Sequence, residues 1–118
     1  MSIIHVIDSY VHDRRIAVLI QLRAESDYAT RTDEFQHLSK DIAMHIAACS
    51  PDSVDALLQQ AFVKVPSLSI EQLIANVSAS LREHIAIIRF VRWDTNPTRL
   101  VQPEPPKSPA VVMRMQRG

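Results

Sequence analysis

Two runs of residues with strong preference for β-strands lie close together at the start of the chain. Residues 3–12 and 16–24 are rich in β-branched and aromatic side chains, and only the polar residues 13–15 separate them. Along the second run Val18, Ile20 and Leu22 fall on one side. This alternation predicts an antiparallel hairpin. The mixed character of the other side predicts a sheet that packs on helices through one face and is partly open on the other.

An amphipathic helix is predicted directly after the hairpin. Thr30 and Thr32 are suitable N-caps, and Asp33 and Glu34 would lie in the first turn, where the helix dipole favours acidic side chains. Pro51 ends the pattern. The apolar stripe of this helix, which would face the sheet, consists of Phe35, Leu38, Ile42, Ile46 and Cys49.

The second half of the chain predicts two shorter helices and one more strand. A brief helix is expected over residues 54–62, and a longer one from Ser67 or Ser69 to Leu81. Residues 84–93 are apolar at nearly every position, so we expect them to form the third and most central strand. The predicted fold class is α+β: a three-stranded antiparallel sheet with helices packed on one face and a Pro-rich C-terminal tail.

Two parts of the chain differ in composition. Five prolines fall between Pro97 and Pro109, so residues 97–118 are predicted to be an extended or disordered tail, and residues 1–96 the folded domain. Thirteen basic residues balance thirteen acidic ones, which argues against nucleic acid as a direct partner. No apolar run is long enough to span a membrane. The single Cys49 and the lack of a leader pattern predict a cytoplasmic protein.

Catalytic and metal-binding patterns are weak. His37, Asp41 and His45 recur every four residues on one helix, which could align two imidazoles and a carboxylate, but a solvated polar stripe explains the spacing better. Cys49 falls on the buried stripe, where a nucleophilic thiolate is not expected. The only glycine is Gly118, so no glycine-rich loop could hold phosphates. We expect no metal, no cofactor and no enzymatic activity.

The segment Ser26, Asp27, Tyr28 and Ala29 follows the second strand and places an acid beside an aromatic residue. An aromatic side chain at the end of a rigid strand is a suitable wedge, because it offers a large apolar area at low cost in conformational entropy. A neighbouring carboxylate can disturb an anion or metal site. The alternative is an acidic loop whose Tyr28 folds back on the core.

Several segments, in this order, resemble the core domain of translation elongation factor Ts. They are residues 9–28, residues 32–48 with the sequence IAMHIA, residues 60–67 (QAFVKVPS, similar to a QPFVK-type turn), residues 70–74, and residues 85–92 (IAIIRFVR, similar to an IRRF-type strand). The resemblance covers Ser9 to about Trp93. Between Ala48 and residue 60 the interval is short, where family members usually carry a helical protrusion.

The resemblance implies a binding partner and binding residues. Ser26, Asp27, Tyr28 and Ala29 stand where the family has its TDFV motif, which contacts elongation factor Tu beside its nucleotide. His45 would contact the same partner from the rim of the helix, although a histidine satisfied within the protein is the alternative. Met44, Ala47 and Ala48 would form an apolar surface for the partner or for a second copy in a homodimer.

The function implied is binding to elongation factor Tu and promotion of GDP release during translation elongation. The alternative is a protein without exchange activity that acts as a homodimeric or ribosome-associated scaffold.

Overall fold

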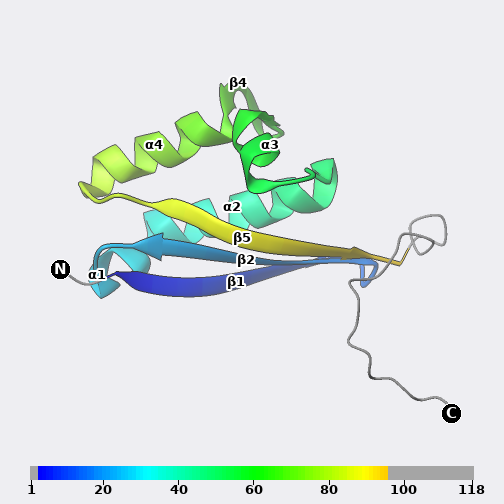
Figure 1. Cartoon of the computed structure of the whole chain (residues 1–118), viewed down its shortest axis with the longest axis horizontal. Helices are drawn as coiled ribbons and strands as arrows, with labels where there is room; N and C mark the ends of the chain where they lie inside the picture. Colours follow the sequence, from blue (N-terminus) through cyan, green and yellow to red (C-terminus); the bar gives the residue numbers. More distant parts are fainter. Residues whose placement is uncertain (1–2, 96–118) are drawn as a thin grey trace, which may run out of the picture.

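Residues 3–95 are described by the computed structural model, and Figure 1 shows one sheet with helices against one of its faces. The strands β1 (Ile4–His12), β2 (Ile16–Ala24) and β5 (Ala86–Asp94) are antiparallel. Their order is β1-β2-β5. The predicted α+β class and three-stranded sheet are confirmed, and the predicted tail lies outside the described residues.

The expectation that the last strand is central is wrong, because β2 lies between β1 and β5. The nearly continuous apolar run of β5 is typical of a strand buried on both faces. In this structure its residues alternate instead: Ile87 is buried while Val91 and Trp93 are exposed. The register of β2 against β5 shifts between Gln21 and Leu22, which marks a bulge.

The β1–β2 turn is tight although it contains no glycine. Asp13 and Arg14 have φ angles of 54° and 59°, and the amide of Arg15 donates to the carbonyl of His12 at 2.9 Å. Two consecutive positive φ angles suit the right-handed twist of a hairpin. Side chains other than glycine cost about 1 kcal/mol or more in this region, so the paired strands stabilise the turn.

The helices are α1 (Asp27–Thr30), α2 (Asp33–Cys49), α3 (Val54–Gln59) and α4 (Ile70–Leu81). The predicted caps of two helices are confirmed. Thr32 Oγ1 accepts from the amide of Phe35 at 3.1 Å, and Ser69 forms a reciprocal capping box with Gln72 at the start of α4. Helix α2 ends at Ser50 in the left-handed conformation, directly before Pro51.

The brief helix predicted over residues 54–62 is shorter than expected. Gln60 leaves the helical conformation, with φ −75° and ψ 145°, and its amide closes the last turn on the carbonyl of Leu57 at 3.1 Å. A small second sheet follows, formed by β3 (Ala61–Phe62) and β4 (Val65–Ser69). The buried Phe62 ring anchors this sheet on the core.

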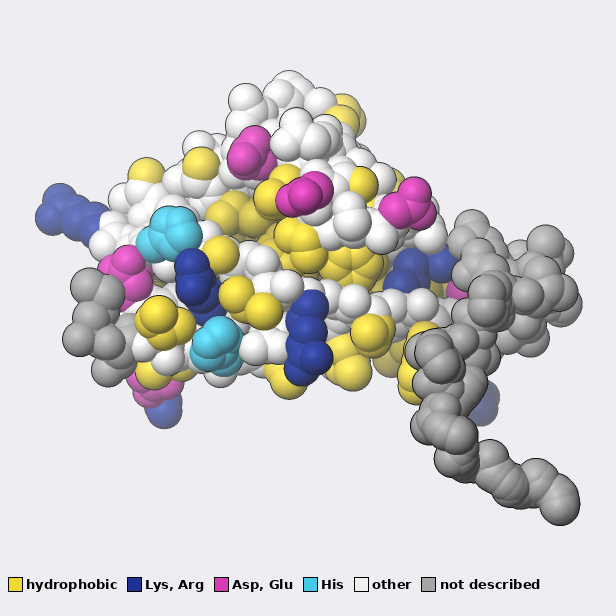
Figure 2. Space-filling model, viewed as in Figure 1, with side chains coloured by type: hydrophobic (Ala, Val, Ile, Leu, Met, Phe, Trp, Pro, Cys, Tyr) yellow, Lys and Arg dark blue, Asp and Glu magenta, His cyan; other side chains and the backbone are white. Residues whose placement is uncertain are grey.

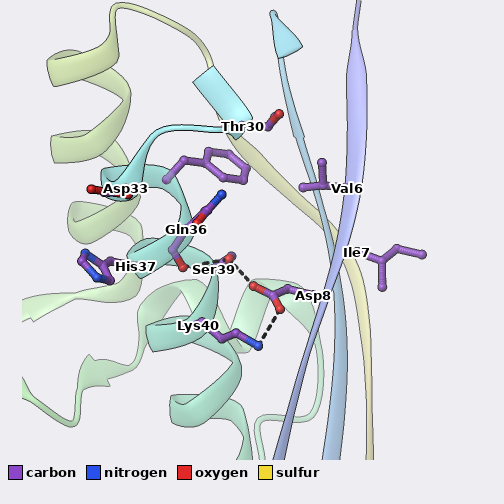
Figure 3. Close-up of a pocket in the computed structure, with 10 residues that line it drawn as sticks. Val6, Ile7, Asp8, Thr30, Asp33, Gln36, His37, Ser39 and Lys40 are labelled. Atoms are coloured by element: carbon purple, nitrogen blue, oxygen red, sulfur yellow. Dashed lines mark hydrogen bonds and ion pairs between the residues drawn. The ribbon is translucent and has the colours of Figure 1, made fainter. Parts of the chain in front are cut away.

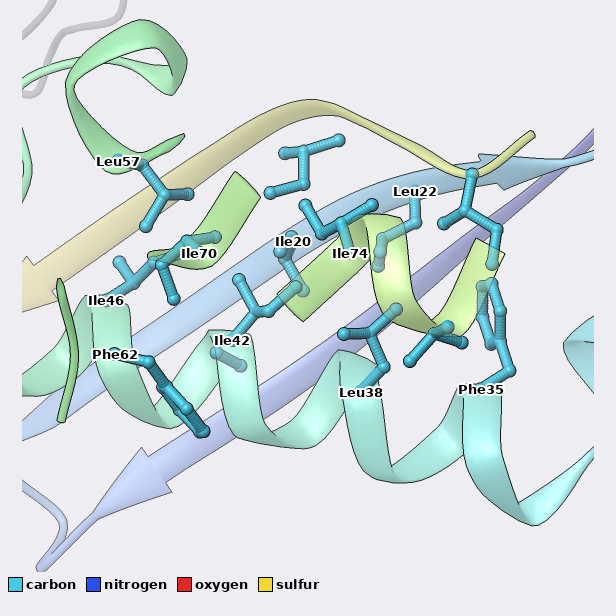
Figure 4. Packing of buried hydrophobic residues seen from close by; sticks show 14 of the residues in the cluster. Ile20, Leu22, Phe35, Leu38, Ile42, Ile46, Leu57, Phe62, Ile70 and Ile74 are labelled. Carbon is cyan, nitrogen blue, oxygen red and sulfur yellow. The ribbon is translucent and has the colours of Figure 1, made fainter. Parts of the chain in front are cut away.

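The core lies between the sheet and the helices, and Figure 4 shows the apolar stripe of α2 pointing at β2 and α4. Each of the large side chains of the core, which are listed at the end of this paragraph, is at most 7 % exposed. Burying one such side chain stabilises the fold by about 1.5–3 kcal/mol. The residues that meet here are Phe35, Leu38, Ile42 and Ile46 from α2, Ile20 and Leu22 from β2, and Ile70 and Ile74 from α4.

Arg92 ties β5 to the end of α2 on the covered face. Its Nη2 and Nε donate to the carbonyl of Ala47 at 2.9 and 3.2 Å, and its Nη1 pairs with Asp94 at 3.2 Å. The Arg92 and Asp94 side chains are only 12 % and 14 % exposed. A guanidinium in this position also complements the negative end of the helix dipole.

The other face of the sheet carries no helix of the described residues, and we name it the open face. Alternate residues of each strand lie on it, as the register requires. The open face comprises His5, Ile7, Ser9 and Val11 from β1, Ala17, Leu19, Gln21 and Arg23 from β2, and Arg89, Val91 and Trp93 from β5.

Candidate partner-binding site

Residues 25–31, between β2 and the N-cap of α2, form a corner that presents the acid and the aromatic residue identified in the sequence. Ser26 is the N-cap of α1, with φ −141° and ψ 151°, and its Oγ accepts from the amide of Ala29 at 3.1 Å. The segment expected as a loop is therefore a single helical turn. Its position depends on its caps, because one turn has little stability of its own.

Tyr28 projects into solvent, with 77 % of the residue exposed. The alternative in which it folds back on the core is wrong. Ala29 behaves in the opposite way: it is 1 % exposed and packs in the core cluster. Ala29 therefore anchors the corner from below, and it does not belong to the surface that another protein could touch.

Asp27 has a partner that the sequence analysis missed. Its Oδ2 lies 2.8 Å from Nε of Arg31, four residues further along, with both side chains more than 60 % exposed. The spacing that brings them together is the ordinary helical one, so it would have been visible had the segment been taken as a helix. The corner thus presents Asp27, Tyr28 and Arg31 side by side.

Glu83, from the turn between α4 and β5, is the second residue that the sequence analysis missed. Its carboxylate accepts from the amides of Glu25 and Ser26 at 3.1 and 3.0 Å, and from the hydroxyl of Ser26. The residues are nearly sixty positions apart in the chain, so no local pattern could reveal the contact.

His45 is fully buried, at 0 % exposure, and the expected rim position is wrong. The amide of Val63 donates to its Nδ1 at 3.2 Å, so Nε2 carries the proton and donates to Oε1 of Gln60 at 2.8 Å. Both ring nitrogens are satisfied within the chain. His45 connects the small β3–β4 sheet to α2, and this segment covers the part of the helix that was expected to be its rim.

The prediction that Met44, Ala47 and Ala48 form an apolar surface is also wrong. Ala47 is 4 % exposed and Met44 packs partly buried against the core, so only Ala48 is exposed. Helix α2 contacts β1 and β2 on one side and α4 on another. A helix covered from several directions has no free apolar face opposite its stripe.

A groove of about 460 Å³ lies between the outer edge of β1 and the α1–α2 region (Figure 3). Asp8 accepts from Nζ of Lys40 at 2.8 Å and from Oγ of Ser39 at 2.5 Å. Burial raises the pKa of the Asp8 carboxyl, but the hydrogen bonds from Lys40, Ser39 and the Ser9 amide together outweigh it and hold the pKa below its ordinary value.

Metal binding finds no support in residues 3–95, where no three His, Cys, Asp or Glu side chains gather in a way that could hold an ion. Asp41, from the polar stripe, pairs with Lys64 at 2.9 Å. Burial raises the pKa of the Cys49 thiol, which disfavours a reactive thiolate. Within the same residues, no helix is both long and apolar enough to cross a membrane.

Comparison with known proteins shows which sequences resemble this chain. Residues 3–56 match the family model described as Elongation factor TS. The chain is 29 % identical to the elongation factor Ts of Alkaliphilus metalliredigens over 134 aligned positions, covering 75 % of this chain and 62 % of the relative. For Thermodesulfovibrio yellowstonii the identity is 28 %, covering 80 % of this chain and 69 % of the relative. For Solibacter usitatus it is 30 %, covering 74 % and 63 %.

The chain spans less than two thirds of the length of most of these relatives. An alignment of 134 positions is longer than the whole chain of 118 residues, so the relatives carry segments without a counterpart here. That accords with the short interval after Ala48. The matched residues include the β1–β2 hairpin, the corner and α2. On this evidence of sequence and architecture, the chain belongs to the elongation factor Ts family.

Proposed function

We propose that this protein binds elongation factor Tu and promotes the release of GDP through the corner of residues 25–31. The observation that carries the proposal is the exposure of Tyr28, at 77 %, shortly after a strand that packs Val18, Ile20, Leu22 and Ala24 in the core. Family membership supplies the class of partner. Exchange of this kind needs no reaction at the chain's own residues, in agreement with the prediction that it is not an enzyme.

Tyr28 is the wedge in this mechanism. Its ring carries a large apolar area, and the one-turn helix beneath it is anchored by the buried Ala29 and Thr30. Insertion of a held side chain costs less conformational entropy than insertion of a side chain on a loose loop. A protein that prefers the nucleotide-free partner weakens nucleotide binding by the same factor by which nucleotide weakens its own binding.

Asp27 supplies charge beside the wedge. Its carboxylate is paired with Arg31 in the isolated chain, and the pair is solvated. Exposed pairs of this kind are worth about 0.2–1 kcal/mol or less, so Arg31 can turn toward another acidic group at little cost. Asp27 is then free to repel a phosphate or to compete for the ligands of a metal ion in the partner's nucleotide site.

The test is stopped-flow release of fluorescent GDP from elongation factor Tu of the same organism. Tyr28→Ala should lower the acceleration by tenfold or more, the scale of a lost hot spot of ~1.4 kcal/mol. Its free energy of unfolding should change by no more than about 0.5 kcal/mol. Trp93→Ala is the matched control, since Trp93 is 75 % exposed at the far end of the sheet. Unchanged GDP release with Tyr28→Ala would contradict the proposal.

A second candidate function, self-association, is favoured by the open face. Ile7, Leu19, Val91 and Trp93 are 66 %, 51 %, 48 % and 75 % exposed on it. Figure 2, which looks onto the strands, shows hydrophobic side chains interspersed there with Lys, Arg and His. A second copy of this chain stacked face to face would cover these groups.

The size of the open face sets the strength of such a dimer. Three strands of nine residues span about 30 by 14 Å, or ~400 Å² in plan. A standard interface buries about 800 Å² per partner, so the dimer should be weak. Sedimentation equilibrium should show a concentration-dependent dimer whose Kd rises about tenfold in Trp93→Ala and stays constant in Tyr28→Ala. A monomer at every accessible concentration would exclude it.

A further inference from the structure

We infer that Glu83 is the positioning residue of the corner, fixing the place and direction of the α1 turn that carries Tyr28. The inference rests on the proposed function and adds a residue to it. Glu83 lies on the turn between α4 and β5, which Figure 1 shows at the same end of the molecule as α1. Its carboxylate is hydrogen-bonded to the corner at residues 25 and 26, shortly before Tyr28.

One carboxylate serves three donors. Oε1 accepts from the amides of Glu25 and Ser26 at 3.1 and 3.0 Å, and Oε2 accepts from the Ser26 hydroxyl. Hydrogen bonds to a charged acceptor are roughly twice as strong as bonds between neutral groups. Among the hydrogen bonds and ion pairs of residues 3–95, those of the Glu83 carboxylate all go to the corner.

The bond to the Ser26 hydroxyl passes the constraint on to the helix. A hydroxyl has one proton to donate and two lone pairs to accept with. Because the proton is given to Glu83, the oxygen of Ser26 presents a lone pair to the amide of Ala29, 3.1 Å away. That bond is the N-cap of α1. Glu83 therefore orients the cap, and the cap orients the turn on which Tyr28 stands.

The contact is reciprocal. The amide of His84 donates to Oε2 of Glu25 at 3.2 Å, so the two chain segments exchange bonds in both directions. Glu83 itself is held in place, because its amide donates to the carbonyl of Ser78 at 3.1 Å after Arg82 has turned the chain with φ 59°. This is the bonding pattern of a Schellman helix end. The backbone that carries the Glu83 carboxylate is therefore held in a fixed position.

Local stability of α4 does not account for a carboxylate at this position. The C-terminal end of a helix carries partial negative charge, so an acidic side chain there is unfavourable. The bonds to Glu25 and Ser26 offset that repulsion. The stabilising effect of the Glu83 carboxylate therefore comes from its hydrogen bonds to the corner, which lies far from it in the sequence.

The test compares Glu83→Ala, Glu83→Gln and a control, Glu71→Ala, which removes an exposed acid from the first turn of the same helix. Hydrogen exchange of the free protein is measured first. Protection of the Ala29 amide should fall about tenfold or more in Glu83→Ala, by less in Glu83→Gln, which keeps one acceptor oxygen, and not in Glu71→Ala. The amides of β2 and α2 should keep their protection in all three.

GDP release from elongation factor Tu is measured with the same proteins. The acceleration should fall in the order wild type, Glu83→Gln, Glu83→Ala, with Glu71→Ala equal to wild type. Unchanged protection of the Ala29 amide from hydrogen exchange in Glu83→Ala would overturn the inference, whether or not the protein promotes GDP release. Loss of protection at the Ala29 amide in Glu83→Ala, with GDP release accelerated as strongly as by the wild type, would overturn the inference as well. If the wild type does not accelerate release at all, the proposed function fails, and the loss of Ala29 protection still supports Glu83 as the residue that holds the corner.

Discussion

The two faces of the sheet are built from the same strands and have opposite environments. On the covered face Val18, Ile20 and Leu22 are at most 1 % exposed, whereas Leu19, between them in sequence, is 51 % exposed. Both faces contain apolar side chains, so composition alone does not decide which face is buried. The helices decide it, since α2 contacts both β1 and β2 from one side. The covered face is completed by helices of residues 3–95, and none of the helices in those residues covers the open face.

The largest expected effect comes from neighbouring substitutions on the two faces. Ile20→Ala should lower the free energy of unfolding by about 2–5 kcal/mol, because it leaves a cavity in a packed core. Leu19→Ala should change it by no more than about 0.5 kcal/mol. Urea unfolding at a concentration where the protein is monomeric measures both. Equal losses would mean that the open face is covered within a single chain.

A second comparison uses two arginines of β5. Arg92→Met should lower the free energy of unfolding by about 1–3 kcal/mol, because the carbonyl of Ala47 and the largely buried side chain of Asp94 lose a charged hydrogen-bond donor. Arg89→Met, on the open face, breaks one exposed bond to Gln21 and should cost about 0.5 kcal/mol or less. Thermal and urea unfolding would show the difference. If Arg89→Met proved the more damaging, the assignment of the faces would be reversed.

The smallest effect concerns acid stability at Asp8. The Asp8 pKa is lower in the folded protein than its ordinary value of 3.8. Its stabilising contribution is therefore present above that value and is lost as the pH falls through the folded pKa. Asp8→Asn should be less stable than wild type by roughly 0.2–1 kcal/mol at pH 7, and the gap should close below about pH 4. A gap that persists at pH 2 would assign the effect to packing.

Local patterns predicted those parts of the fold whose neighbours are close in sequence. The hairpin, the stripe of α2 and the N-caps Thr32 and Ser69 follow from alternation, helical spacing and hydroxyl chemistry, and the structure has them as expected. The resemblance to the family, rather than a local pattern, predicts an exposed Tyr28, and Tyr28 is 77 % exposed. Its role toward a partner stays a prediction.

Errors arose where distant segments meet. His45 is bonded to Gln60 and Val63, and α2, which carries Ala47, contacts β1, β2 and α4. Neither can be read from a helical wheel. The central place given to residues 84–93 failed for the same reason, because a nearly continuous apolar run has the same appearance in a buried strand and in an edge strand with an open face. Glu83 was missed because nothing near it in sequence shows its partners.

The backbone groups of Ser9 on the edge strand β1 affect whether a further strand can be added there. Its amide donates to Oδ1 of Asp8 at 2.8 Å and its carbonyl accepts from Nζ of Lys40 at 2.7 Å, so side chains already occupy both backbone groups. An additional strand placed along β1 would have to displace the partly buried carboxylate of Asp8 and the ammonium group of Lys40. Proteins commonly protect exposed strands against unwanted pairing with charges placed in this way. The middle of the β1 edge is therefore protected against the addition of a strand, whereas stacking of another copy through the open face would leave these bonds intact.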